Sequence, residues 1–400
     1  MCHLAQNHKA REGEVIGCHG KFSGHLLVHI KYFWQLCKAN EKNMTNEQLT
    51  QEAVALLRRL IAIPRQSREE TEAANLLWAF MAERGLNPKR DGNNLWATTP
   101  DWNDERQTLL LCAHIDTVKP VEGWKRPPLE ATLEGDRLYG LGANDDGASL
   151  VCLLQVFREL TKNEGASGQG RGNYNLVFLA SAEEEVSGRN GIERVLPLLP
   201  HIDVALVGEP TGMQPAIAEK GLMVLDMTAY GRAGHAAREE GDNAIYHALD
   251  DIQWLRTYEF PEVSPLLGRT KMTVTVVQAG TQHNVVPDRC QFVVDVRTNE
   301  LHSNENIYNR IRAHVKSDVV ARSFRLSSSR IDPSHPLVQR SVALGRTPFG
   351  SPTLSDQALL SCPSLKMGPG QSSRSHTADE FIKISEIREA IDLYLNLLEV

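Results

Sequence analysis

The sequence is poor in cysteine, has no long apolar run and carries no excess of basic residues. Its seven cysteines are scattered over 400 residues, are odd in number and contain no C-x-x-C pair. This pattern argues against a disulfide framework and a cysteine zinc site, and it predicts a reduced, cytoplasmic protein. No apolar stretch approaches the ~20 residues that span a bilayer. The net charge of −7 disfavours nucleic-acid and membrane partners.

The first 43 residues differ from the rest of the chain. They are rich in histidine and lysine, and their apolar patch, Leu26 to Leu36, is interrupted by His29 and Lys31. A signal peptide would need a cleaner apolar core and a small-residue cleavage site. We therefore interpret residues 1–43 as a disordered extension or a translated leader, with Met44 as the natural start.

Apolar periodicity predicts alternating helices and strands over the first half of the remaining chain. Two capping-box patterns, Thr45 with Gln48 and Ser67 with Glu70, each precede an amphipathic helix. A third helix is expected over 148–160 and a flexible Gly/Ser-rich loop over 165–172. Apolar runs predict strands at 95–98, 109–113, 176–180 and 204–207. This alternation predicts an α/β domain whose mainly parallel sheet is flanked by helices.

A different order of elements follows residue 217. Strand, helix, two strands, helix and strand are expected in turn, over 222–230, 243–256, 272–279, 291–298, 304–315 and 319–326. This β-α-β-β-α-β order is that of a ferredoxin-like α+β unit. A strand at 364–367 and a closing amphipathic helix at 384–398 then return to the first sheet. We therefore predict one α/β domain, formed by residues 44–217 and 328–400, with residues 218–327 inserted as a second domain.

The α/β domain is organised around the stretch 109–116, which reads L-L-L-C-A-H-I-D. A short apolar run is typical of a strand buried on both faces of a parallel sheet, and ligands bind beyond the carboxyl ends of such strands. His114 is therefore expected where ligands bind. Residues two apart in a strand point to the same side, so Asp116 can reach the imidazole and fix its tautomer for a metal. Taken alone, the pair fits equally well a core histidine satisfied by a neighbouring aspartate.

Four more motifs follow predicted strands or adjoin them. They are G-L-G-A-N-D-D-G at 140–147, A-E-E-E at 182–185, G-E-P-T at 208–211, and G-P-G with S-H-T at 368–370 and 375–377. Any one of them alone is typical of a solvated polar loop. Together they place two histidines and several carboxylates on one edge of one sheet, which solvation does not explain.

These residue types suit catalytic zinc, which takes histidine, carboxylate and water ligands. Two dications need a shared carboxylate, and three ligating carboxylates against two dications leave the centre positive. Such a centre lowers the pKa of a bound water and stabilises a developing oxyanion. A further carboxylate that binds no metal can then accept the proton of the water.

With these motifs the sequence closely resembles the dinuclear-zinc peptidase family that includes acetylornithine deacetylase and succinyl-diaminopimelate desuccinylase. The motifs H-I-D-T, N-D-D-G, A-E-E-E-V-S-G, G-E-P-T, G-R-A-G-H and G-P-G…S-H-T-A-D-E occur in family order across residues 46–398. The resemblance implies two zinc ions per subunit, with cobalt as a substitute. His114, Asp145 and Glu209 would hold one zinc, Glu185 and His376 the other, and Asp145 would bridge them.

The resemblance also implies roles for residues around the metals. Asp116 would orient His114, and Glu184 would act as the general base that later protonates the leaving amine. His235, in the inserted domain, would stabilise the oxyanion in a partner subunit's active site. The protein would then be a homodimer through its inserted domain.

A small N-acyl amino acid is the substrate that the resemblance implies. Asn284 and Arg297 would bind its polar groups, since a guanidinium fork suits an α-carboxylate. The G-x-N-D and S-H-T-A-D-E variants look most like the acetylornithine deacetylase branch, which hydrolyses N-acetyl-L-ornithine, or N-succinyl-L-ornithine in some relatives, to L-ornithine in arginine biosynthesis. A succinyl group would need a cation near its acyl end, for which Arg374 is the candidate. A succinyl-diaminopimelate desuccinylase, an aminoacylase and a small dipeptidase of the same family are the alternatives.

One departure from the family pattern leaves the bridging residue open. The family reads D-x-K-G or D-x-G-G after the bridging aspartate, whereas Asp145 is followed by D-G-A. Asp145 is the preferred bridge and Asp146 the alternative, while V-S after the triple glutamate favours Glu184 as the base.

A catalytically inactive scaffold that binds amino-acid ligands is the alternative from another functional class. The presence of five candidate ligands and a base argues against it.

Overall fold

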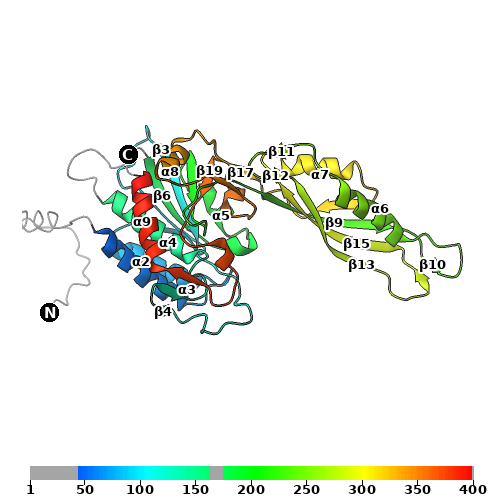
Figure 1. Cartoon of the computed structure of the whole chain (residues 1–400), viewed down its shortest axis with the longest axis horizontal. Coiled ribbons are helices and arrows are strands. Elements are labelled where there is room, and N and C mark those ends of the chain that lie inside the picture. The colour runs from blue at the N-terminus through cyan, green and yellow to red at the C-terminus, as the bar shows by residue number, and fades with distance from the viewer. Residues whose placement is uncertain (1–43, 163–173, 399–400) are drawn as a thin grey trace, which may run out of the picture. The chain divides into compact units, whose positions relative to one another are not determined.

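A nine-stranded sheet is the centre of the α/β domain in the computed structural model, which describes residues 44–162 and 174–398 (Figure 1). Its strands are β1 (Lys89–Asp91), β2 (Asn94–Thr98), β3 (Gln107–His114), β6 (Tyr174–Ser181), β7 (Val204–Val207), β8 (Ala216–Glu219), β17 (Ser329–Arg330), β18 (Phe349–Ser351) and β19 (Ser364–Lys366). Their order is β1-β2-β6-β3-β7-β19-β8-β17, with β18 beside β8. Strands β6, β3, β7 and β19 pair in parallel, so their carboxyl ends share one edge. The predicted extension at 1–43 and loop at 165–172 lie outside the described residues.

Strand β3 is buried along almost its whole length, as its apolar run predicts. Every residue after Gln107 is buried. Leu110 and Cys112 pack in one cluster with two side chains of the short helix α5 (Ile192–Val195). Helix α4 (Gly147–Thr161) contacts both β3 and β6. The predicted α/β class, a central sheet with parallel core strands flanked by helices, is confirmed.

The remaining helices of this domain pack the segment before the inserted domain against the segment after it. Helix α2 (Asn46–Ile61) packs against α4 and against the closing helix α9 (Ile384–Leu398), and α8 (Pro336–Ala343) packs on α9 (Figure 1). The capping box before α2 is confirmed, because Thr45 Oγ1 accepts from the Gln48 N–H at 3.2 Å while Gln48 Oε1 accepts from the Thr45 N–H at 2.9 Å.

The second predicted capping box is wrong. Helix α3 (Thr71–Glu83) begins without a side-chain cap. The Ser67 hydroxyl instead donates to Asp116 Oδ2 at 2.6 Å, and Glu70 Oε1 accepts from the backbone N–H groups of Arg68 and Glu183 at 2.7 and 3.2 Å. Both side chains are therefore engaged by the segments that follow β3 and β6, and neither is left to cap the helix.

The inserted segment forms the predicted β-α-β-β-α-β unit. Its elements are β9 (Gly221–Tyr230), α6 (Ala244–Thr257), β13 (Lys271–Ala279), β15 (Arg289–Thr298), α7 (Asn304–Arg312) and β16 (Asp318–Ala321). The strands are antiparallel in the order β13-β15-β9-β16, which is ferredoxin-like. Alternate residues of β9, beginning with Met223 and Leu225, enter a core that is separate from that of the α/β domain. The domain boundaries at 218 and 328 stay predictions.

Short elements complete the described chain. A three-stranded sheet joins β4 (Thr132–Glu134), β5 (Arg137–Tyr139) and β20 (Phe381–Lys383), and two small ladders pair β10 (Gly234–His235) with β14 (Val285–Val286) and β11 (Val263–Ser264) with β12 (Gly268–Arg269). Single 3-10 turns are η1 (Glu184–Val186), η2 (Leu196–Leu198), η3 (Asp356–Leu359) and η4 (Ser372–Arg374). Within the described ranges, no helix is long and apolar enough to cross a membrane.

Candidate metal centre

Five predicted ligands lie at the carboxyl edge of the parallel strands. His114 is the last residue of β3, Glu185 lies in η1 after β6, and Glu209 follows β7 by two residues. Asp145 lies in the loop that precedes α4, and His376 lies beyond β19. Strand order therefore brings residues that are far apart in sequence to one place, because β6, β3, β7 and β19 are neighbours and run the same way.

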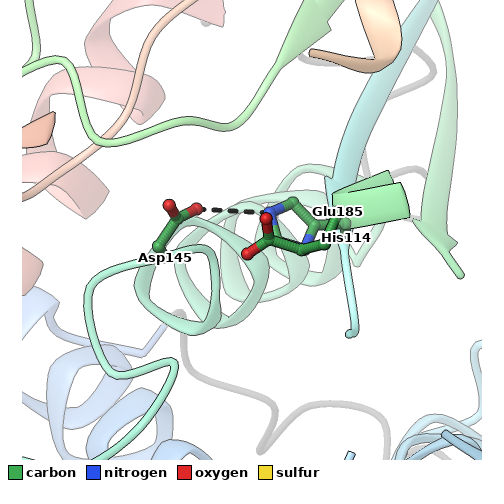
Figure 2. A group of neighbouring side chains, drawn as sticks. All are labelled: His114, Asp145 and Glu185. Atoms are coloured by element: carbon green, nitrogen blue, oxygen red, sulfur yellow. Dashed lines mark hydrogen bonds and ion pairs between the residues drawn. The ribbon is translucent and has the colours of Figure 1, made fainter. Parts of the chain in front are cut away.

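One group of ligand atoms surrounds Asp145. His114 Nε2 lies 3.3 Å from Asp145 Oδ1, and His376 Nε2 lies 3.7 Å from Asp145 Oδ2. His376 Nε2 is also 3.0 Å from Glu185 Oε2. Figure 2 shows Asp145 hydrogen-bonded to His114, with the Glu185 carboxylate beside the imidazole. One ligand atom each from His114, Asp145 and Glu185 lies within 4.8 Å of the others, which is close enough to share one cation.

A second group shares His114 with two further glutamates. Ligand atoms of His114, Glu184 and Glu209 also lie within 4.8 Å of one another, and Glu184 Oε2 is 3.9 Å from His114 Nε2. The predicted base therefore lies within the cluster of ligands rather than outside it. A carboxylate in this place can exchange a proton with a molecule bound between the two groups.

Asp116 anchors the segment that carries the two glutamates. His114 Nδ1 lies 3.0 Å from the backbone carbonyl of Asp116 and 3.5 Å from its carboxylate. The carboxylate oxygens also accept from the backbone N–H groups of Glu184 at 3.1 Å and Glu185 at 3.2 Å, and from the Ser67 hydroxyl. Asp116 thus links the predicted orientation of His114 with the position of η1, a second role that its sequence position did not reveal.

His114 is buried, and the pKa values of His114, Glu184 and Glu209 are shifted far from their ordinary ranges. Burial alone would lower the pKa of His114, but hydrogen bonds to Asp116 and Asp145 outweigh it and hold the pKa well above its usual range. Burial, together with neighbouring carboxylates, raises the pKa values of Glu184 and Glu209 well above the ordinary range. Several carboxylates compete for few positive charges, which is the electrostatic setting that a divalent cation relieves.

Asp145 and Asp146 occupy different environments. Asp145 faces both imidazoles, whereas no hydrogen-bond partner reaches either carboxylate oxygen of the fully buried Asp146 among the described residues. Burial raises the pKa of Asp146 to about 8. The position between two imidazoles suits a bridging ligand, and this favours Asp145 over Asp146 in that role.

The donor set fits a pair of divalent cations. Imidazole and carboxylate groups are the ligands of catalytic zinc and of related transition metals, and two overlapping groups of three are present. The predicted division, with His114, Asp145 and Glu209 on one ion and Glu185 and His376 on the other, stays a prediction. The two groups in the structure instead place Glu185 beside His114 and Asp145, and Glu184 beside His114 and Glu209.

The remaining predicted site residues lie elsewhere. His235 is exposed on β10, and its Nδ1 accepts from the Ala237 N–H at 3.1 Å. Asn284 lies on the adjoining segment, and its carbonyl accepts from the Ala236 N–H at 3.0 Å. Arg297, on β15, forms a bidentate pair with Asp295. Within residues 44–162 and 174–398, no hydrogen bond or ion pair joins these three side chains to the candidate ligands.

Arg374 is adjacent to the centre in sequence but is paired. Its guanidinium donates to the two carboxylate oxygens of Glu386 at 2.7 and 2.9 Å and lies over the Phe381 ring, 4.5 Å from the ring centroid. A substrate carboxylate would have to compete with Glu386 for this fork.

Three further residues around the centre were missed by the sequence reasoning. They are Arg65, Glu380 and Lys366, all of them 2% exposed. Glu380 ends the S-H-T-A-D-E motif and therefore carried a sequence signal. Arg65 follows Pro64 and belongs to no motif. Nothing in the local pattern marks Lys366, because it continues an otherwise apolar strand.

Comparisons with known proteins identify the family and the fold. A model of the peptidase family M20/M25/M40 matches residues 110–400. A tripeptidase from Staphylococcus aureus is 19% identical with a TM-score of 0.69, and the match covers 90% of this chain and 99% of that one. An M20 metallo-carboxypeptidase from Sulfolobus solfataricus is 20% identical, with a TM-score of 0.67 and coverage of 87% and 98%. A dinuclear metal-binding M20 peptidase from Bacillus subtilis is 16% identical, with a TM-score of 0.66 and coverage of 88% and 98%.

Replacing Glu184 tests whether it is the general base and Glu185 the metal ligand. Glu184→Gln keeps a similar volume and is expected to retain both metals, while kcat falls about 10²–10⁴-fold because the proton acceptor is lost. Glu185→Gln is the matched variant and is expected to lose metal. Elemental analysis of both purified variants, together with kcat, checks the assignment. Metal loss from Glu184→Gln alone would mean that the two roles are exchanged.

Proposed function

Because the chain belongs to the peptidase family M20/M25/M40 and is therefore a metal-dependent hydrolase, we propose that it cleaves the amide bond of a small N-acyl amino acid. The preferred substrates are N-acetyl-L-ornithine and N-succinyl-L-ornithine, with release of L-ornithine for arginine biosynthesis. The observation that carries the proposal is the pair of overlapping ligand groups with Glu184 among them. The choice of substrate rests on the motif variants of the sequence.

The chain's own residues have separate tasks in this reaction. When bound, the metal pair, which we propose to be zinc, polarises the amide carbonyl and activates a water molecule. Glu184 accepts the proton of the attacking water and returns it to the leaving nitrogen. Asp116 holds the backbone of Glu184 and Glu185, so the base keeps its place relative to His114. A misplaced base loses much of its effect because proton transfer requires hydrogen-bond reach.

A cavity beside Glu209 is the proposed place for the acyl group. Its volume is about 280 Å³, at the lower end of ligand pockets, which suits a small substrate. The lining includes hydroxyl or amide side chains at Thr211, Ser351, Thr353, Gln371 and Ser372. Lys366 also lines it, but its ammonium already donates to both oxygens of Thr353 at 3.0 Å and pairs with Glu219 at 3.1 Å.

Peptide hydrolysis is the second candidate. Several proteins of similar fold are peptidases, including the tripeptidase from Staphylococcus aureus. At 20% identity or less these likenesses concern the fold, so the substrate must be decided by experiment.

A hydrolysis panel distinguishes these candidates. The zinc-loaded protein is expected to cleave N-acetyl- or N-succinyl-ornithine with a higher kcat/KM than N-succinyl-diaminopimelate, N-acetyl-methionine or small dipeptides. Amine release, measured with the same metal content for every substrate, gives the comparison. A preference for dipeptides would replace the deacylase proposal with a peptidase, and no turnover with bound metal would favour the scaffold.

Arg374 is proposed to recognise the carboxylate of a succinyl group. Arg374→Ala is then expected to lower kcat/KM for N-succinylornithine at least about tenfold more than for N-acetylornithine, because only the former presents a second carboxylate. Glu386→Gln is the matched variant, which frees the guanidinium and leaves succinyl hydrolysis intact or improved. Equal losses on both substrates would instead assign Arg374 to its structural pair with Glu386.

We further propose a homodimer through the inserted domain, with His235 acting in the partner's active site. The edge strand β13 supports this, since no strand among residues 44–162 and 174–398 pairs with its outer side, and it exposes Val276 and Val277 by 44% and 54%. Exposed edges of this kind are normally covered.

Mixing two inactive variants tests this arrangement. His235→Ala is expected to keep its metals but lose turnover through weaker oxyanion stabilisation. In a refolded 1:1 mixture with Glu184→Gln, the heterodimers contain one complete site, so about a quarter of the wild-type activity should return. An inactive mixture in which heterodimers are shown to form would place His235 outside the partner's site.

A further inference from the structure

The loop that carries Asp145 is held by one buried carboxylate. Glu380 Oε1 accepts from the backbone N–H groups of Asn144 at 2.8 Å and Asp145 at 2.9 Å, and Oε2 accepts from the Gly142 N–H at 3.0 Å. Glu380 is itself fixed where β20 pairs with β5, because its carbonyl accepts from the Gly140 N–H at 3.0 Å. Four backbone groups of one short loop thus depend on a single residue.

A buried guanidinium holds the same loop through its carbonyl groups. Arg65 donates from Nη2 to the carbonyl of Gly142 at 2.8 Å and from Nη1 to the carbonyl of Ile115. Ile115 stands between His114 and Asp116, so Arg65 connects the end of β3 with the loop of Asp145. Gly142 is therefore held at both of its backbone polar groups, by Glu380 at the N–H and by Arg65 at the carbonyl.

Glycine is required where the loop meets Arg65. A Cβ on Gly142, which has a φ of +70°, would come within 2.4 Å of Arg65 Nη2 and of Thr117 Cγ2. A Cβ on Gly147 would lie 2.4 Å from the Gly142 carbonyl oxygen and 3.0 Å from Arg65 Nη2. Gly142 is thus required by its positive φ and the close approach of Arg65, and Gly147 by the close approach of the Gly142 carbonyl.

The same loop is also joined to the segment of His376. Asn144 Oδ1 accepts from the Gln371 N–H at 3.0 Å, and Asn144 Nδ2 donates to the Gln371 carbonyl and Ser375 Oγ, both at 3.1 Å. Because Asn144 lies beside Asp145, a shift of the loop would move the bridging carboxylate and the segment of the second histidine together.

We propose that Arg65 and Glu380 form a buried charge bracket that positions Asp145 between His114 and His376 for binding of the metal pair. Neither residue touches the metals, so both are positioning residues. Partners beyond the ligands fix ligand orientation, and their loss typically weakens metal binding about 10–100-fold. The bracket rests on the proposed function only in requiring a metal pair, and it is independent of the substrate.

Charged groups are suited to this task for a specific reason. One carboxylate offers enough lone pairs for three N–H donors in a fixed place, and the planar guanidinium offers donors to two carbonyl groups at once. An amide at position 380 would replace one accepting oxygen by an NH₂ that faces backbone N–H groups.

Zinc titration of the metal-free protein tests the bracket without any substrate. Glu380→Gln is expected to bind zinc about 10–100-fold more weakly, with an altered visible absorption spectrum when cobalt is bound, because the bridging carboxylate is displaced. The Arg65 variants should also bind zinc more weakly, and Arg65→Met should lose more affinity than Arg65→Lys.

Asp251→Asn is the matched control. Asp251 is also a buried carboxylate that accepts backbone N–H groups, those of Lys316 at 3.0 Å and Ser317 at 2.8 Å, but it lies in the inserted domain. This variant is expected to lower the melting temperature and leave zinc affinity and the cobalt spectrum unchanged. An equal loss of zinc affinity in Asp251→Asn would reduce the bracket to general destabilisation and overturn it.

The double variant shows whether Arg65 and Glu380 act together on zinc binding or independently of each other. If both side chains act by holding Gly142, Arg65→Met with Glu380→Gln should weaken zinc binding little more than the worse single variant. Folded Glu380→Gln protein with wild-type zinc affinity and cobalt spectrum would overturn the proposal. Should Glu380→Gln not fold, the same two measurements on Arg65→Lys decide it, since this variant keeps the charge and loses the two-pronged geometry.

Discussion

Carboxylates crowd the edge where β3, β6 and β7 end, and the arrangement of the α/β domain depends on offsetting their charge. Asp145, Glu184, Glu185 and Glu209 lie around His114, and burial raises the pKa values of Glu184 and Glu209 well above their usual range. Like charges at such distances repel strongly where water is excluded. Two divalent cations would remove this repulsion, so metal binding and the stability of the folded chain are expected to be coupled.

Hydrogen bonding divides the buried carboxylates of this region into two kinds. Asp116 and Glu380 accept backbone N–H groups at both of their oxygens, and these bonds hold the segments that bear the ligands. Within the described residues, no backbone N–H donates to the side chains of Asp145, Glu184 or Glu209. Carboxylates that accept backbone N–H groups therefore support the site, and the three that accept none remain available for cations and protons. The same residue type performs both tasks, and only the backbone around it decides which.

The sequence predicted the fold well because most of its signals are local or periodic. The run before His114 identified β3, the capping box identified α2, and the element order identified the ferredoxin-like unit. The Ser67–Glu70 pattern misled because the same residues that cap helices also bond to distant segments, and Ser67 bonds to Asp116 instead. Strands β8, β17 and β18 were missed because they are two to four residues long and gain their stability from neighbours rather than from pattern.

The candidate site was predictable in its residues but not in its supports. Ligand types stand in recognisable motifs, and parallel strands that end at one edge bring them together. Arg65 has no such mark, because its role depends on Gly142 and Ile115, which lie 77 and 50 positions away. A contact of this range leaves no trace in one sequence. The pairing of Arg374 with Glu386 also could not be predicted from the sequence, and it occupies the guanidinium that a substrate carboxylate would bind.

The junction between the two parts of the α/β domain shows that the site depends on pairing between distant parts of the chain. Strand β8 is the last element before the inserted domain, and its partners β17, β18 and β19 all come from the chain that returns after it. Glu219 at the end of β8 pairs with Lys366 of β19 and accepts from the Ser355 hydroxyl at 2.8 Å, away from solvent. The returning chain then supplies His376 and Glu380. The five candidate ligands are therefore brought together only when the chain that returns after the inserted domain pairs with β7 and β8.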